Sequence, residues 1–215
     1  GRDVDVCDNL LTNIGDDAFE PEGAAVNARF WRNRIRGTHN GISLAPVVEG
    51  PVFLLRNVIS DFQQNPFKIS NGSSGPVFVY HNTTWTDVDG RNGLALYDPY
   101  SGITLRNNIV RGRGYAVEQT VADQGTDIDY DNLYTTRGAP VIKWSGTRYD
   151  TLAAWCRATG RGCSAIGAAP GLVNPSAGDF SLRRDSPNVD TGVRLLGIND
   201  GWAGAGPDIG AFERQ

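Results

Sequence analysis

Residues 52–57 read VFLLRN, and residues 77–82 read VFVYHN. In both stretches apolar residues stand five and three positions before an asparagine, which is the two-residue period of a β-strand with one buried face. The pattern recurs through the first two thirds of the chain, where its asparagines are Asn9, Asn33, Asn57, Asn82, Asn108 and Asn132. Their spacings of 24, 24, 25, 26 and 24 residues predict a chain built from stacked repeats.

The sixth repeat departs from the others. Ile128 and Tyr130 stand one residue closer to Asn132 than the pattern requires, which we interpret as a one-residue deletion in the turn. A second apolar column recurs in the other half of each repeat, and it comprises Phe19, Ile42, Phe67, Leu94, Val117 and Ile142. Two or three short strands per repeat, with no helix between them, are typical of a solenoid. The sequence therefore predicts an all-β fold, a right-handed parallel β-helix of about six rungs.

The repeated asparagines have a structural explanation. Asparagine tolerates a left-handed backbone at a bend between sheets, and its amide can hydrogen-bond to the asparagine of the next rung. We therefore predict an asparagine ladder at this bend, and a second ladder formed by Asn40, Asn65 and Asn92. His81, beside the ladder residue Asn82, is predicted to be a turn residue away from the functional face.

The repeat ends near residue 146. Residues 1–145 are predicted to form the rungs, and residues 146–215 a C-terminal tail that packs on the same domain. Within the tail, Asp150–Thr159 indicates a short helix, with Asp150 as its N-cap and Gly160 just beyond its end. Phe180–Leu182 is predicted to form a strand.

Composition limits the classes of partner. A net charge of −4 argues against a nucleic-acid partner. The sequence contains no apolar run of about 18 residues, so we expect no membrane-spanning helix and no membrane partner. The 27 glycines favour turns over long helices. Cys156 and Cys163 can pair across a short loop, which leaves Cys7 single.

The N-terminal end of the predicted solenoid needs a cover. The sequence contains no methionine, and residues 1–6 enter directly into a rung. The end of a solenoid exposes unpaired backbone groups and an apolar cross-section. We therefore expect either missing N-terminal rungs or an end-to-end oligomer through this end.

Two segments of the tail carry a resemblance to a known family. Residues 186–192 (SPNVDTG) and 206–213 (GPDIGAFE), together with the rungs, resemble the bacterial right-handed parallel β-helix repeat proteins over nearly the whole chain. That family is mostly secreted and is dominated by glycoside hydrolases and lyases that degrade polysaccharides, with some non-enzymatic members. The resemblance implies a secreted, periplasmic or cell-surface protein whose partner is a polysaccharide or oligosaccharide.

A narrower resemblance is to the polygalacturonase-type glycoside hydrolases. It rests on residues 15–17 (GDD) and, one rung later, on residues 39–41 (HNG), where that family has Gly-Asp-Asp and Gly-His-Gly. Here an asparagine is inserted and no Arg-Ile-Lys triplet follows, so Lys68 is the nearest basic residue. The resemblance implies catalytic roles for the two aspartates and the histidine.

Polar residues gather on one predicted face, next to the second apolar column. The candidate catalytic residues there are Asp16, Asp17, Glu20, Glu22 and His39, and the candidate substrate-binding residues are Lys68, Arg91 and Tyr97. Glu20 and Glu22 would stand about 7 Å apart, which fits the carboxylate spacing of an inverting glycosidase. The leading hypothesis is a polysaccharide-cleaving glycoside hydrolase that uses a carboxylate acid–base pair.

Three alternatives stay open for this face. In a polysaccharide lyase, Lys68 and Arg91 would supply the proton abstractor and a cation for the uronate. The acidic strand could instead hold calcium, or belong to a non-catalytic glycan-binding or structural module. The sequence has no cluster of histidine and cysteine, so no zinc site and no resident cofactor are expected.

The outer face of the other predicted sheet carries apolar residues. Trp31, Leu55 and Tyr80 form one outward column, and Phe53 with Phe78 another. We predict that the tail helix, through Leu152 and Trp155, covers this surface. A sugar-stacking platform and an oligomer interface are the alternatives.

Overall fold

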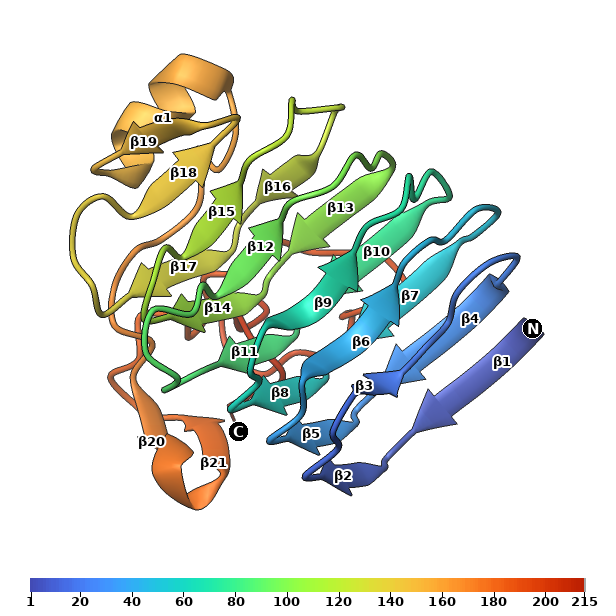
Figure 1. Cartoon of the computed structure of the whole chain (residues 1–215). Coiled ribbons are helices and arrows are strands. Elements are labelled where there is room, and N and C mark those ends of the chain that lie inside the picture. The colour runs from blue at the N-terminus through green and yellow to red at the C-terminus, as the bar shows by residue number, and fades with distance from the viewer. Residues whose placement is uncertain (215) are drawn as a thin grey trace.

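The computed structural model describes residues 1–214. Its strands stack into a parallel β-solenoid of six turns, which begins at β1 and ends beside α1 (Figure 1). Residues paired in neighbouring strands along the first sheet are 23 to 26 positions apart in the sequence. The predicted all-β solenoid and its repeat length are confirmed.

Three sheets run along the solenoid axis. Sheet 1 contains β1 (Arg2–Cys7), β4 (Val26–Trp31), β7 (Val52–Leu55), β10 (Val77–Tyr80), β13 (Ile103–Arg106) and β16 (Asp127–Asp129). Sheet 2 contains β2 (Leu10–Thr12), β5 (Arg34–Arg36), β8 (Val58–Ser60), β11 (Thr83–Trp85), β14 (Ile109–Gly112) and β17 (Asn132–Thr135). The third side, which we call sheet 3, is interrupted between β9 and β12. Its first part contains β3 (Asp17–Phe19), β6 (Asn40–Leu44) and β9 (Asn65–Ile69), and its second part contains β12 (Leu94–Leu96), β15 (Val117–Gln119), β18 (Ile142–Trp144) and β19 (Thr147–Tyr149). The strands pair in parallel until β19, which turns back antiparallel on β18.

The core lies between the three sheets and contains the predicted apolar columns. In sheet 1, Val52 and Leu54 pair in register with Val77 and Val79, and all four side chains are buried. In sheet 3, the buried members of the second column are Ile42, Phe67, Leu94, Val117 and Ile142. The apolar alternation in the sequence therefore corresponds to the alternation of core and outer faces along each strand.

The asparagine ladder forms at the bend between sheets 1 and 2. In it each side-chain amide donates to the side-chain oxygen of the next rung, through Asn9, Asn33, Asn57, Asn82 and Asn108. Asn108 then donates to Asp131, whereas Asn132 begins β17 and pairs with Ile109. The predicted sixth ladder residue was therefore wrong by one position. The register of β16 with β13 is continuous, so the sixth turn contains an aspartate in place of the asparagine rather than a deletion.

The second predicted ladder is shorter than expected. The backbone N–H of Asn65 donates to the Asn40 side chain, as a ladder requires. The Asn65 oxygen then accepts from the backbone of Ala95, and the Asn92 amide donates to Glu118 instead. The ladder breaks between β9 and β12.

The helix α1 (Leu152–Thr159) covers the C-terminal end of the solenoid. Trp155 is fully buried and packs on Trp144 of the last turn, with ring centroids 5.2 Å apart. The prediction that this helix covers the outward aromatic columns was therefore wrong, because the helix packs on the apolar end of the last turn instead. The N-cap is Thr151 rather than Asp150, since the Thr151 hydroxyl accepts from the backbone of Ala154.

The helix is tied to the loop that follows it. A disulfide joins Cys156 to Cys163, so the pairing that the sequence left open is present. Gly160 lies between them with φ of 71°, a left-handed conformation that ends the helix as predicted. Cys7 is free.

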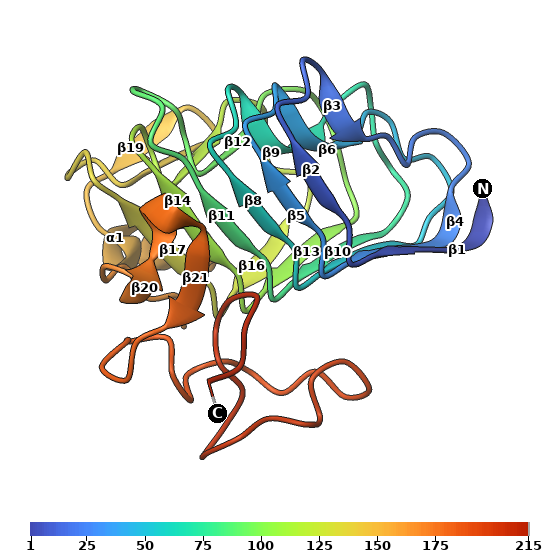
Figure 2. The same ribbon diagram turned by 90° about the horizontal axis from the view of Figure 1, so that it is seen from below.

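The rest of the tail folds back over sheet 2 (Figure 2). Strands β20 (Leu172–Asn174) and β21 (Asp179–Leu182) form a hairpin, and the strand predicted at Phe180–Leu182 is thereby confirmed. The hairpin and the last residues form a second apolar cluster with sheet 2, which contains Val58, Ile109, Leu172, Phe180, Leu182, Ile209 and Ala211. Sheet 2 is thus buried on both faces over much of its length.

A loop of the tail, not the helix, borders the outward aromatic columns of sheet 1. Gly197 and Ile198 line a cleft together with Trp31, Leu55 and Tyr80. Leu196 of the same loop is 81% exposed, so the cover is incomplete. None of the helices in residues 1–214 is long and apolar enough to span a membrane.

Candidate functional site

The outer surface of sheet 3 carries a first polar network. Its members are Asp17, Glu22, Asn40, Ser43 and Lys68. The Lys68 Nζ lies 2.8 Å from Asp17 Oδ2, and Asn40 Nδ2 donates to Asp17 Oδ1 at 2.7 Å. The Ser43 hydroxyl donates to Glu22 Oε1. The network exists because β3, β6 and β9 stack in parallel, which brings residues from three turns of the chain together.

Asp17 is held ionised in this network. Its side chain is only 2% exposed. Burial by itself raises the pKa of Asp17, but the hydrogen bonds from Lys68 and Asn40 outweigh burial and bring the pKa below its usual value. The same hydrogen bond raises the pKa of Lys68, which stays an ammonium ion.

A second polar network lies further along sheet 3. Lys143 Nζ lies 2.7 Å from Glu118 Oε1, and Asn92 Nδ2 donates to Glu118 Oε2 at 2.6 Å. The Tyr97 hydroxyl donates to the same oxygen at 3.1 Å, and Tyr97 is 44% exposed. Burial raises the pKa of Glu118, yet Lys143 and Asn92 outweigh it and hold the pKa below its usual value.

The two networks contain only part of the predicted set. The structure joins Asp17, Glu22 and Lys68 in the first network and places Tyr97 in the second. The other predicted residues, Asp16, Glu20, His39 and Arg91, are exposed, and within residues 1–214 their side chains form no hydrogen bond to either network. Asp16 and Glu22 are nonetheless near enough for their charges to raise the pKa of Lys68.

The alternation in the sequence places Glu118 on the outward polar face, but Glu118 and Lys143 were not among the predicted site residues. Glu118 pairs in register with Lys143, and Ser43 pairs with Lys68 in the same way. The signal was available, because Lys143 follows Glu118 after 25 residues, close to one repeat length. What the sequence does not give is the choice of rotamers that joins these side chains across turns.

These geometries limit the chemistry of sheet 3. Two carboxylates of low pKa suit hydrogen-bond acceptors or an electrostatic role, whereas a general acid needs a raised pKa. Lys68, with a raised pKa, is a poorer proton abstractor than a free lysine. Within residues 1–214, no three or more histidine, cysteine, aspartate or glutamate side chains form a group suited to a metal ion.

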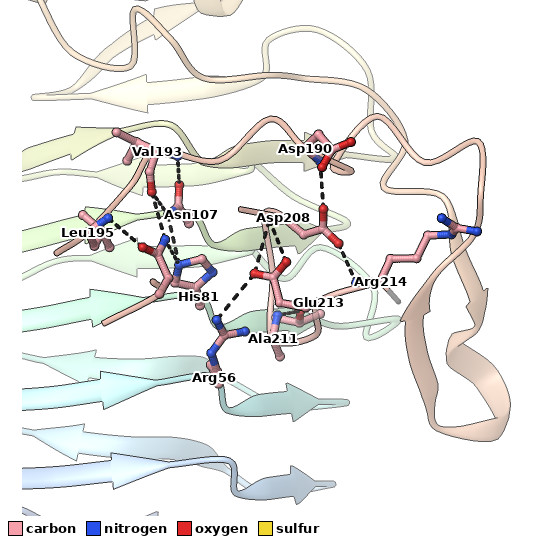
Figure 3. Close-up of polar contacts among 12 residues, drawn as sticks. Arg56, His81, Asn107, Asp190, Val193, Leu195, Asp208, Ala211, Glu213 and Arg214 are labelled. Carbon is pink, nitrogen blue, oxygen red and sulfur yellow. Dashed lines mark hydrogen bonds and ion pairs between the residues drawn. The ribbon is translucent and has the colours of Figure 1, made fainter. Parts of the chain in front are cut away.

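A third polar group fastens the tail to the bend between sheets 1 and 2 (Figure 3). His81 is buried there, and its Nε2 accepts from Asn107 at 3.0 Å and from Asn199 at 2.8 Å. Because Nε2 accepts twice, Nδ1 carries the ring proton, and it is buried without a hydrogen-bond partner among residues 1–214. Burial, helped by Arg56, lowers the pKa of His81 to about 3. This histidine is neutral and structural, as its predicted place in a turn suggested.

The tail motifs form the other half of this anchor. Asp208 accepts from the backbone N–H groups of Asp190 and Arg214, at 2.7 Å and 2.6 Å. Glu213 accepts from the backbone of Asp208 and lies 3.5 Å from Arg56 of the solenoid. Residues 186–192 and 206–213 thus form hydrogen bonds within the tail and connect the tail to the turns of the solenoid (Figure 3).

Comparison with known proteins adds no relative. No protein-family model, no curated protein and no solved structure matches the chain. The fold assignment therefore rests on the strand pairing, and the resemblance to polysaccharide-degrading families is carried by the sequence motifs alone.

Proposed function

We propose that this chain is a secreted, carbohydrate-active β-solenoid that binds a polysaccharide along the outer surface of sheet 3. The supporting observation is that both polar networks lie on the same side of the solenoid and are each built from paired strands, with Ser43 beside Lys68 and Glu118 beside Lys143. Neighbouring turns stack about 4.8 Å apart, so the networks form a strip rather than one compact pocket. A strip fits an extended polymer better than it fits a small molecule.

The groups on this strip suit sugar hydroxyls. The ionised carboxylate of Glu118 can accept from them, and the amide of Asn92 and the ammonium of Lys143 can donate to them. The ring of Tyr97, which is partly exposed beside Glu118, offers an apolar surface for one face of a sugar.

Hydrolysis of the bound polysaccharide is the second candidate activity. An acid–base pair needs one protonated and one ionised carboxyl group, and Asp17 and Glu118 are both held ionised. The general acid would therefore be one of the remaining predicted carboxyls, Asp16, Glu20 and Glu22. Among these three, Glu22 is the one that a hydrogen bond joins to the first network, through the Ser43 hydroxyl.

Binding is tested by affinity electrophoresis in gels that contain polygalacturonate, xylan or a mixed-linkage β-glucan. We expect at least one of these polymers to retard the wild-type chain, and Glu118→Gln to weaken the retardation about tenfold, since it removes the ion pair with Lys143 and the charge on the acceptor. Arg157→Gln, an exposed change on α1, is the matched control. Equal retardation of wild type and Glu118→Gln would contradict the placement of the strip.

Turnover separates the enzymatic forms of the proposal. Hydrolysis releases reducing ends without ultraviolet absorbance, whereas a lyase releases unsaturated, absorbing products. Glu22→Gln should abolish hydrolysis, but the variant should still be retarded in the gels, because glutamine keeps a polar side chain at this place. Assays with added calcium and with EDTA test the calcium alternative. Retardation without either kind of product identifies a non-catalytic binding module.

A further inference from the structure

The geometry points to a second ligand site, for a small organic anion with an apolar body, between sheet 2 and the tail. We call it the arginine groove; Arg34, Arg36, Val58, Ser60, Phe180 and Phe212 are among the residues that line it. Its volume is about 240 Å³, and a second cleft of about 230 Å³ adjoins it and shares Arg34, Val58 and Phe212. The groove belongs to sheet 2, so it is separate from the polar strip on sheet 3.

The charge in the groove comes from alternating arginines of the segment Arg32–Arg36 (RNRIR). Arg32 pairs with Asp8 and Arg36 with Asp61, at 2.6 Å and 2.9 Å. Arg34 stands between them, at the junction of the two clefts, and has no ion pair within residues 1–214.

Asp179 is close enough to Arg34 to respond to its charge, but the two side chains form no ion pair. Asp179, in the tail hairpin, accepts from the hydroxyl and the backbone N–H of Ser181, and these two bonds are the main cause of its lowered pKa. Arg34 adds only a weaker attraction through space. The guanidinium therefore keeps its donors available for the planar anion that it fits best, a carboxylate or a sulfonate.

Apolar side chains from both sheet 2 and the tail line the groove beside Arg34. The Arg34 guanidinium lies 5.5 Å from the centre of the Phe212 ring, and Val58 and Phe180 belong to the apolar cluster under the tail. A guanidinium beside an aromatic ring offers a ligand both an ionic partner and a surface for stacking. A ligand that carries a carboxylate on an apolar body uses both the guanidinium and the apolar lining, whereas an inorganic anion uses only the guanidinium.

Benzoate is the probe, and benzyl alcohol is its neutral counterpart of similar shape. In isothermal titration or ligand-observed NMR, benzoate should bind wild type, and benzyl alcohol should bind about tenfold more weakly. Arg34→Gln should weaken benzoate binding by about the same factor. Arg157→Gln, an exposed arginine outside the groove, should leave it unchanged. Unchanged benzoate affinity in Arg34→Gln, or an equal loss in Arg157→Gln, would overturn the proposal.

A second pair of measurements tests the apolar lining. Phe212→Leu should weaken benzoate binding and leave the weaker binding of sulfate unaltered, because sulfate needs only the guanidinium. If sulfate binds as tightly as benzoate, the organic body contributes nothing and the proposed ligand class is wrong. Arg34 is exposed, so a thermal melt should find Arg34→Gln folded like wild type. None of these outcomes depends on whether sheet 3 binds a polysaccharide.

Discussion

Asp131 accepts two hydrogen bonds from Asn108 through a single oxygen. The backbone N–H of Asn108 and its side-chain Nδ2 reach Asp131 Oδ1 at 2.7 Å and 2.8 Å. The other oxygen, Oδ2, is buried and has no partner within residues 1–214. In the preceding turn, the atom that corresponds to Asp131 Oδ2 is Asn108 Nδ2, which donates to the carbonyl of Val79. An aspartate can donate there only when protonated, and its burial raises the pKa of Asp131 to about 7.

We expect Asp131→Asn to stabilise the protein above neutral pH. The folded chain keeps the Asp131 proton up to about pH 7, whereas the unfolded chain releases it near the usual value of 3.8. The folded state binds more protons in this window, so the free energy of unfolding falls as the pH rises through it. Asparagine supplies a donor and has no charge, so the free energy of unfolding of the variant should not fall in this pH range.

The measurement is urea unfolding of both proteins across the pH range. The two free energies should agree near about pH 4 and differ by at most about 4 kcal/mol above about pH 7, with the variant more stable. Asp98→Asn, at an exposed position, is the control. Parallel pH profiles for wild type and Asp131→Asn would show that the carboxyl does not titrate in this window.

Asn57→Ala should destabilise the protein strongly. Its Oδ1 accepts from the backbone and the side chain of Asn33, and its Nδ2 donates to Phe30 and Asn82. Alanine would leave several buried polar groups without partners, at about 1–3 kcal/mol each, so a total loss of about 3–5 kcal/mol is expected. Gln63→Ala, at an exposed position, should change the free energy of unfolding by less than about 0.5 kcal/mol. A small effect of Asn57→Ala would mean that water replaces the ladder contacts.

The repeat was predictable because side-chain alternation and strand stacking are both local rules. Val52 and Leu54 are buried for the reason that the sequence suggested. The error at the sixth turn arose because the pattern was defined by asparagine. Asp131 provides the acceptor that the ladder needs from its last member, but an ionised carboxylate cannot also donate as an amide does, so aspartate can replace asparagine most easily at the end of the ladder.

It was harder to predict which segment of the tail packs on which apolar surface of the solenoid. Both the outward aromatic columns and the end of the last turn are apolar, and composition does not decide which of them takes the helix. In the structure the helix α1 covers the C-terminal end of the solenoid, where Trp155 packs on Trp144. The sequence predicted that polar residues share one face, but it did not predict which of them form hydrogen-bonded networks. The contact between Glu118 and Lys143, for example, depends on the rotamers of two side chains from neighbouring turns.

Trp155→Ala should cost about 3–5 kcal/mol in the free energy of unfolding. The side chain is completely buried and forms the contact between the helix and the last turn, so alanine would leave a large cavity there. Arg157→Ala on the exposed side of the same helix is the control, because it alters helix propensity little and removes no packing. Chemical unfolding of the two variants measures the difference. A loss below about 0.5 kcal/mol for Trp155→Ala would mean that the helix does not hold the end of the solenoid.

The last prediction concerns the pair formed by Lys68 and Asp17. Lys68→Met keeps most of the length and the apolar stem of the lysine but removes its charge. Asp17 would then be a buried carboxylate without its cation, and burial, the largest influence on its pKa, would raise that pKa. We expect a loss of about 1–2 kcal/mol at neutral pH, reduced by solvent screening because the Lys68 side chain is 39% exposed.

The pH dependence distinguishes this mechanism from lost packing. In wild type the pKa of Asp17 is lowered, so its stabilising contribution is present above the usual value of 3.8 and is lost as the pH falls through the folded pKa. In Lys68→Met the carboxyl is easier to protonate, so the deficit relative to wild type should shrink as the pH falls toward about 4. The double variant Lys68→Met/Asp17→Asn has no buried charge to compensate, and it should recover most of the loss at neutral pH. If the double variant is less stable than Lys68→Met, Asp17 is held by Asn40 and Ser43 rather than by the lysine, and the ion pair contributes little.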